Sequence, residues 1–222
     1  MKEHCVQTNQ TFDIIRTAVG ETAFPNTWED LQGNPWKVFQ VQAGSNEYNQ
    51  VIQKFQQGAA YIQTIVKLER IQNVALYKQF LAQEEKVRAK MSSRGVGQTV
   101  TRELFHGTSG DVTDNIYRNG FDRSHAGKNA TAYGKGVYFA VQAQYSHNYT
   151  SLDRNNHRCM FLSKVVTGEY CAGNSSMITA PAIAGGQKNE LYDSVVNRVS
   201  NPTMYVVFKD ASVYPDYVLT YQ

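Results

Sequence analysis

The second half of the chain alternates short apolar runs with glycine-rich turns, and this pattern constrains the fold more than any other feature of the sequence. The runs are rich in β-branched and aromatic residues, which is typical of strands. They lie at residues 104–106, 137–140, 160–162, 164–166, 204–208 and 217–220. One helix is expected between the first two runs, from about Val112 to Asn119, with Gly120 as its C-cap. Many short strands with few helices between them predict a mostly antiparallel sheet.

The first half carries helix signals beside two strands. Residues 37–42 and 65–71 predict strands by their β-branched and aromatic content, the second with some helical character. Ser45 precedes a predicted helix at residues 47–57, and an apolar face predicts another helix from residue 74 to about 91. The expected fold class is therefore α+β, with a mostly antiparallel β-sheet core and flanking helices.

Length and composition indicate one globular domain after a short preceding segment. Residues 1–24 show little pattern and are interpreted as a linker or the remnant of an upstream region. The remaining residues 25–222 are long enough and apolar enough for one packed core, since 41% of the chain is hydrophobic.

The expected location is inside the cell, in the cytoplasm and/or nucleus. Cys5, Cys159 and Cys171 contain no Cys-x-x-Cys pair, which favours a reducing compartment. No apolar run approaches the ~20 residues that cross a membrane. The start of the chain lacks the apolar core of a signal peptide.

Charge and metal-ligand patterns are weak. The net charge of +3 is too small to predict a nucleic-acid footprint, and the run Lys86–Lys90 is interpreted as a solvated helix face. His147, His157 and Cys159 are close in sequence, but their spacing fits no compact zinc motif. No metal site and no nucleic-acid partner are therefore expected.

Two short motifs could build a ligand site. In Phe105-His106-Gly107-Thr108, a histidine at a strand end can point into a cleft, and the glycine lets backbone groups approach a ligand. A structural histidine before a turn is the alternative reading. In the segment at residues 133–140, Gly134 and Gly136 precede a strand and could cradle a phosphate or form a tight turn. This segment lacks the third glycine of a dinucleotide fingerprint.

In combination, these motifs resemble the NAD site of the poly(ADP-ribose) polymerase family. Tyr138 follows His106 within Gly-Lys-Gly-x-Tyr-Phe-Ala, and Ser146 and Tyr149 come next. Further stretches are similar to the macrodomain-bearing mono-ADP-ribosyltransferase branch. They lie at residues 47–49, 69–73, 119–124, 126–129, 205–208 and 214–217. The resemblance covers roughly residues 24–222 and implies the split-sheet fold of diphtheria-toxin-type ADP-ribosyltransferases.

The resemblance implies a role for each matching residue. His106 would hold the adenosine ribose. Gly107 would clamp the nicotinamide carboxamide through its backbone amide and carbonyl, and Ser146 would give that amide a third hydrogen bond. Tyr138 would form one wall of the nicotinamide slot.

The opposite wall of the slot has two candidates. Tyr149 matches best, and Tyr145 is the second candidate, because the related branch usually has this tyrosine where Ser151 stands here. The loop from residue 123 to 133 corresponds to the family's lid, where Ser124, Lys128 and Asn129 would contact adenosine or phosphates or else face solvent. The NAD-binding residues implied in this way are His106, Gly107, Thr108, Ser124, Asn129, Tyr133, Tyr138, Tyr145, Ser146 and Tyr149.

Met204 stands where chain-elongating members of the family have a glutamate. Aligning Tyr-Val-Val-Phe at residues 205–208 with the family strand gives this position, and the catalytic positions become His106, Tyr138 and Met204. In a strand, Met204, Val206 and Phe208 share one face. Methionine cannot act as a general base. The substitution therefore predicts that no chain of ADP-ribose is built.

The activity implied is that of an NAD-dependent protein mono-ADP-ribosyltransferase, a glycosyltransferase that releases nicotinamide. Glycosidic cleavage passes through an oxocarbenium-like state, and the positively charged nicotinamide leaves without a general acid, so single transfer can survive the loss of the glutamate. Glu or Asp side chains of acceptor proteins are the favoured targets. Glu190, Asp193 and Asp216 are interpreted as solvated surface carboxylates rather than auxiliary bases.

Two other functions remain open from the sequence. One is a catalytically silent module that binds NAD or ADP-ribose, and the other is ADP-ribosylation of nucleic-acid ends. The expected partners are acceptor proteins, including the chain itself through automodification. No membrane association is expected, and the protein is expected to be a monomer.

Overall fold

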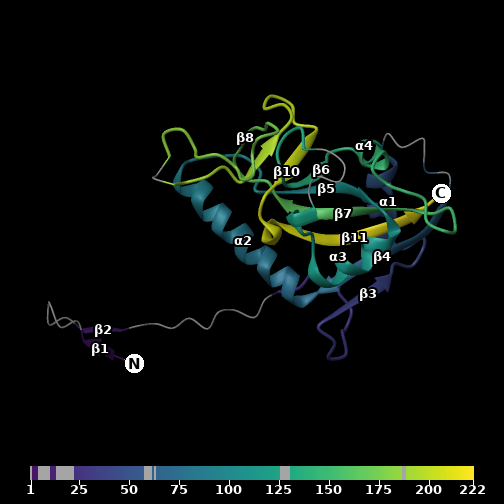
Figure 1. Ribbon diagram of the computed structural model, residues 1–222. Coiled ribbons are helices and arrows are strands. Elements are labelled where there is room, and N and C mark those ends of the chain that lie inside the picture. Colours follow the sequence, from purple (N-terminus) through teal and green to yellow (C-terminus); the bar gives the residue numbers. More distant parts are fainter. Residues whose placement is uncertain are drawn as a thin grey trace.

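The computed structural model describes residues 23–57, 62, 64–125, 131–186 and 189–222, together with two short paired strands near the start of the chain, β1 (Lys2–His4) and β2 (Thr11–Asp13). Nine further strands in the described residues form one sheet in the order β3-β4-β11-β7-β5-β6-β10-β9-β8 (Figure 1). Their bounds are β3 Trp36–Gln40, β4 Ile65–Asn73, β5 Thr101–Thr108, β6 Val137–Ala140, β7 Arg158–Val166, β8 Tyr170–Ala172, β9 Ser194–Val196, β10 Met204–Val207 and β11 Val213–Tyr221.

The helices begin and end at residues whose chemistry explains their position. Ser45 caps α1 (Asn46–Gln56) by accepting a hydrogen bond from the Tyr48 amide, and Asn73 caps α2 (Val74–Ser93) in the same way. Gly120 ends α3 (Thr113–Asn119) with a φ of 78°, which confirms the expected C-cap. The remaining helical segments are α4 Ala143–His147 and the 3₁₀ turns η1 Gly110–Val112, η2 Arg123–His125 and η3 Asp210–Ser212.

The sheet is almost divided in two, which confirms the predicted split, mostly antiparallel architecture. β5 pairs with β7 along its whole length, whereas Phe105↔Ala140 is the one pairing recorded between β5 and β6 in the described residues. Within this sheet of the described chain, β8 and β9 are the one parallel pair. The two parts of the sheet therefore separate just beyond Phe105.

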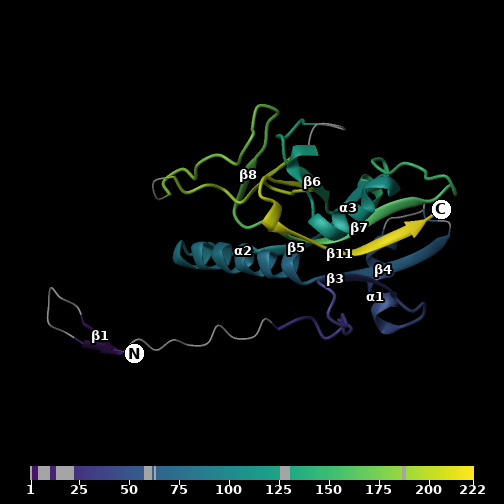
Figure 2. The same cartoon turned by 60° about the horizontal axis from the view of Figure 1, so that its bottom comes forward.

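Helices cover the larger part of the sheet on both faces. Alternate residues of β7 point to opposite sides: Phe161 packs with Ile116 of α3, and Met160 packs with Phe55 of α1. Figure 2 shows α1 and α3 on opposite sides of the sheet. Burial on both faces explains why strands such as β7 are nearly continuous apolar runs rather than alternating ones.

The sequence and the structure differ at several elements. The apolar runs at residues 160–162 and 164–166 belong to one strand, β7. The short elements α4, β8 and β9 were not expected. In the part of the chain that the structure describes, no helix is long and apolar enough to span a membrane. The boundary between residues 1–24 and 25–222 stays a prediction.

Candidate active site

A cavity of about 690 Å³ opens where β5 and β6 separate. Its walls come from the end of β5, helix α3, the turn at residues 131–136, β6, α4 and the first residue of β10. Most of the residues predicted for the site line this cavity: His106, Gly107, Thr108, Tyr133, Tyr138, Tyr145, Ser146, Tyr149 and Met204.

His106 is held in one orientation by its neighbours. Its ring packs against Phe121 and Phe139, at centroid distances of 4.9 and 5.4 Å. Its Nδ1 lies 2.8 Å from the carbonyl oxygen of Tyr138, and because a carbonyl only accepts, Nδ1 must carry the proton. Burial lowers the pKa of His106 from 6.5, so the ring is neutral at physiological pH. Its Nε2 is therefore a hydrogen-bond acceptor.

Tyr138 is fixed through its hydroxyl. The hydroxyl donates to the carbonyl of Gly134 at 2.8 Å and accepts from the amide of Tyr133 at 2.9 Å. Gly134 has a φ of 130°, a backbone conformation that favours glycine. Burial raises the pKa of Tyr138, so the phenol stays protonated. The turn before β6 therefore sets the direction of the Tyr138 ring.

Gly107 is required by the close approach of α4. A Cβ atom at this position would lie 1.9 Å from the backbone oxygen of Ser146. The sequence interpretation, that this glycine admits a ligand, is therefore incomplete, because the protein itself occupies the space beside its Cα. The Ser146 hydroxyl donates to the Phe105 carbonyl at 3.0 Å. Backbone groups two residues apart in a strand face the same edge, so the amide and carbonyl of Gly107 face this side too.

Tyr145 and Tyr149 form a pair at the cavity. Their hydroxyl oxygens are 3.1 Å apart, and their ring centroids are 5.5 Å apart. Burial, with a further contribution from the hydrogen bond to Tyr149, raises the pKa of Tyr145 to about 12. Ser151 also lines the cavity. Both tyrosines are thus close enough to contribute to one wall.

Met204 faces the cavity from the first position of β10. It pairs with Ala140 of β6 and is 4% exposed. Further along β10, Val206 packs in a cluster with Tyr138, whereas Tyr205 packs on the opposite side. The predicted alternation along this strand is confirmed, and it brings a thioether to the same cavity as His106 and Tyr138.

The predicted lid contacts are not brought together with the cavity. Ser124 lies in η2, is exposed, and is not among the described residues of the cavity wall. Its amide donates to Asp122 Oδ1 at 2.7 Å. Lys128 and Asn129 lie outside the described residues. Their contacts to adenosine or phosphate stay predictions.

Sequence reasoning did not single out several polar residues of the wall. Asn115, Asp122, Asn148 and Thr150 line the cavity. Asp122 belongs to the stretch at residues 119–124 that resembles the family, but nothing in the sequence indicated that its side chain reaches the cavity. The other three follow no local motif, and only the folded arrangement of α3 and α4 brings them there.

The interpretation of three nearby carboxylates as solvated surface groups was wrong for Asp193 and Asp216, and Glu190 is only partly exposed. Asp193 is buried and pairs with Lys90 at 2.6 Å, and Asp216 is buried and pairs with Lys164 at 3.1 Å. Glu190 pairs with Arg94. None of the three is among the described residues that line the cavity. Within the described chain, no cluster of three or more His, Cys, Asp or Glu side chains could hold a metal ion.

Comparison with known proteins gives consistent matches. The family model of the poly(ADP-ribose) polymerase catalytic domain matches residues 45–222. The human protein mono-ADP-ribosyltransferase PARP14 is 37% identical over 215 residues, which are 96% of this chain and 12% of that protein. The human protein mono-ADP-ribosyltransferase PARP12 is 36% identical, over 91% of this chain and 28% of that protein. The mouse protein mono-ADP-ribosyltransferase PARP11 is 31% identical, over 89% of this chain and 64% of that protein. The chain thus spans less than two thirds of the length of each of these relatives.

Proposed function

Because the chain belongs to the poly(ADP-ribose) polymerase catalytic-domain family, we propose that it is a mono-ADP-ribosyltransferase that moves single ADP-ribose units from NAD to protein side chains. The observation that carries this proposal is the meeting of His106, Tyr138 and Met204 in one cavity. Several relatives are named protein mono-ADP-ribosyltransferases, which supports the same activity here.

The residues of the cavity fit NAD. Its volume of about 690 Å³ lies within the range of roughly 300–1,000 Å³ that small-molecule sites occupy. The Nε2 acceptor of His106 suits a ribose hydroxyl, which can donate. The backbone of Gly107 suits a carboxamide, which both donates and accepts. Tyr138 and Tyr149 supply aromatic faces for the nicotinamide ring.

Among the described residues of the cavity wall, the first position of β10 is a methionine, which cannot act as a general base. A nicotinamide attached to ribose carries a positive charge and leaves without a general acid, so the protein has to orient it and exclude water. Among the described residues of the wall, the one carboxylate is Asp122, which follows Phe121 on the His106 side. A serine or lysine acceptor would need a base to remove its proton, whereas an acceptor carboxylate is already ionised near pH 7. The proposed acceptors are therefore Glu and Asp side chains.

The test follows the two halves of NAD separately. The protein is incubated with NAD labelled in the nicotinamide and, in parallel, with NAD labelled in the adenosine. We expect released nicotinamide together with adenosine label bound to protein, and neither with His106→Ala. His106→Ala is a better inactive control than a bulky substitution of Gly107, such as Gly107→Trp, because any side chain at residue 107 collides with Ser146.

Two results would count against the proposal. Thermal stabilisation by NAD without nicotinamide release would indicate a silent binding module. Nicotinamide release without protein-bound label, even with candidate acceptor proteins present, would indicate hydrolysis of NAD.

We also propose that the protein acts as a monomer inside the cell, on acceptor proteins and on itself. The free thiols of Cys159 and Cys171 support a reducing compartment. Sedimentation of the purified protein with and without reductant tests the first part of this proposal.

A further inference from the structure

The crossover that connects β8 to β9 links the cavity to helix α2. β8 and β9 are parallel neighbours, so the chain has to leave the sheet after Ala172 and return before Ser194. In this crossover the structure describes residues 173–186 and 189–193, with one isolated bridge, Ala182↔Leu191, and no helix. Long connections without secondary structure of their own are uncommon within compact domains.

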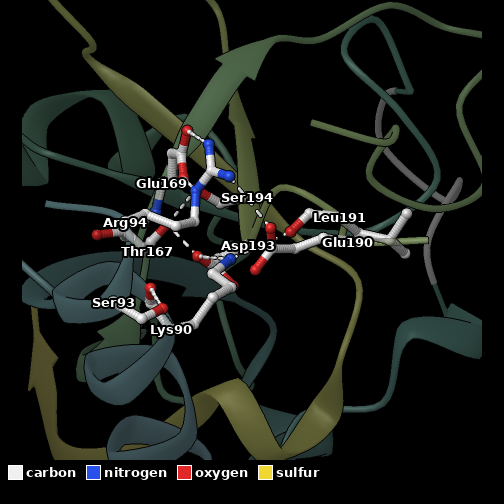
Figure 3. A network of polar contacts seen from close by, with 9 residues as sticks. All are labelled: Lys90, Ser93, Arg94, Thr167, Glu169, Glu190, Leu191, Asp193 and Ser194. Carbon is white, nitrogen blue, oxygen red and sulfur yellow. Dashed lines mark hydrogen bonds and ion pairs between the residues drawn. The ribbon is translucent and has the colours of Figure 1, made fainter. Parts of the chain in front are cut away.

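Figure 3 shows two cations at the end of α2, Lys90 and Arg94, with the carboxylates that they pair with. Arg94, the residue after α2, reaches Glu169 at 3.2 Å through Nε and Glu190 at 3.1 Å through Nη1. Lys90, one turn earlier in α2, reaches Asp193 at 2.6 Å. Glu169 precedes β8 and so lies just outside the crossover, whereas Glu190 and Asp193 lie at its end, before β9.

These ion pairs lie largely away from solvent. The side chains of Arg94, Glu169 and Glu190 are 23%, 13% and 17% exposed, and Asp193 is 4% exposed. The same Asp193 oxygen accepts the Glu169 amide at 2.9 Å. Removing one partner of a pair in such a place leaves a poorly solvated charge alone, which costs far more than losing a surface pair.

The middle of the crossover contacts the turn before β6. The Met177 carbonyl accepts the Lys135 amide at 2.8 Å. A Cβ atom on Gly173 would lie 2.4 Å from the Tyr133 carbonyl oxygen, so the two backbones touch. Ala180 and Met177 belong to the same apolar cluster as Tyr138.

That turn also holds the Tyr138 hydroxyl, through the amide of Tyr133 and the carbonyl of Gly134. A continuous set of contacts therefore runs from Arg94 through the crossover to a wall of the cavity. We propose that Arg94 is a positioning residue for the NAD site, acting through the crossover on Tyr133 and Tyr138. This inference rests on the proposed function, because it assumes that NAD occupies the cavity.

The test compares NAD binding and turnover in Arg94→Ala, Arg94→Lys and the wild-type protein, at a temperature where circular dichroism shows each fully folded. A wall that contacts nicotinamide before and during reaction contributes to binding in both states, so its loss raises KM and leaves kcat nearly unchanged. We expect Arg94→Ala to raise the Kd and KM for NAD by roughly 2- to 30-fold, the range for mutations within coupled networks. Arg94→Lys should restore part of the lost NAD affinity, because lysine keeps the positive charge. The rescue should be incomplete, because a single ammonium group cannot span both glutamates.

Arg88→Ala is the matched control. Arg88 lies in the same helix and pairs with Glu84, but its side chain is 56% exposed and it makes no recorded contact with the described part of the crossover. Its KM for NAD should equal that of the wild type. If Arg94→Ala is folded and binds NAD as the wild type does, Arg94 has no positioning role. If the wild type itself fails to bind NAD, the proposed function fails instead.

Discussion

The imidazole of His106 donates through Nδ1 to the Tyr138 carbonyl, so Nε2 can only accept a hydrogen bond while the ring is neutral. Protonation would turn Nε2 into a donor, so a ribose hydroxyl could no longer donate to it. Burial holds the pKa of His106 below 6.5. We therefore expect the Kd for NAD to be flat above pH 7 and to rise as the pH falls below 6.5, measured by calorimetry.

The same shift links His106 to stability. Because the pKa of His106 is lower in the folded state, the folded state binds fewer protons than the unfolded state as the pH falls below 6.5. The free energy of unfolding therefore contains a contribution from His106 that is present above pH 6.5 and is lost on acidification. His106→Gln should remove the His106-dependent part of both effects. A Kd that instead falls on acidification would contradict the need for a neutral, accepting Nε2.

We expect Met204 to contribute to the shape of the cavity wall and to take no part in proton transfer. A general acid or base typically contributes about 10²- to 10⁴-fold to rate. Met204→Leu should therefore keep kcat within about threefold of the wild type, since volume-conserving apolar exchanges are tolerated best. Single-turnover nicotinamide release measures this. A hundredfold loss in a folded Met204→Leu protein would show that the thioether itself takes part.

The affinity of variants for nicotinamide distinguishes the roles of Tyr145 and Tyr149. Tyr149 is the favoured nicotinamide wall, and Tyr145 would act through the bond between their hydroxyls. Loss of a stacking ring is worth roughly 1–3 kcal/mol, and loss of a hydrogen bond about 1 kcal/mol. We expect Tyr149→Ala to weaken nicotinamide binding more than Tyr145→Ala does, in an equilibrium titration. The reverse order would assign the wall to Tyr145.

At the scale of elements, the contact of β5 with α4 is the feature that the sequence conceals. Gly107→Ala would push a methyl group into the Ser146 carbonyl, a backbone atom that cannot rotate away. We expect a loss of about 1–3 kcal/mol in the free energy of unfolding, as for other overpacked sites. Gly97→Ala is the control, because nothing lies within 4 Å of its added Cβ. Denaturant midpoints of equal value for the two variants would contradict the contact.

Elements with strong local signals were predictable, and several of the shortest ones were not. In the sequence, Ser45 indicated the start of α1, an apolar face indicated α2, and Gly120 indicated the end of α3. Helix α4 spans Ala143–His147, too short for a periodic signal, although it brings Ser146 to the site. β8 and β9 contain three residues each, and their pairing depends on partners far away in the chain.

At the scale of the whole molecule, the site exists because the sheet separates between β5 and β6. Most of the site residues that the motif resemblance indicated line the cavity, but strand order, the His106 tautomer and the buried ion pairs follow only from the fold. Asp193 and Asp216 looked like surface residues because their cationic partners, Lys90 and Lys164, are distant in sequence. The sequence therefore predicted what the site contains better than how the site is held.

The most direct test of the central claim is the mass of ADP-ribose at each modified side chain. The protein is incubated with NAD, digested, and each modified peptide is weighed by mass spectrometry, with His106→Ala treated in parallel. We predict one ADP-ribose unit per modified Glu or Asp, at every time and NAD concentration, and none in the variant. A side chain that carries a chain of two or more ADP-ribose units would contradict this prediction, because Met204 cannot activate a ribose hydroxyl as a glutamate would.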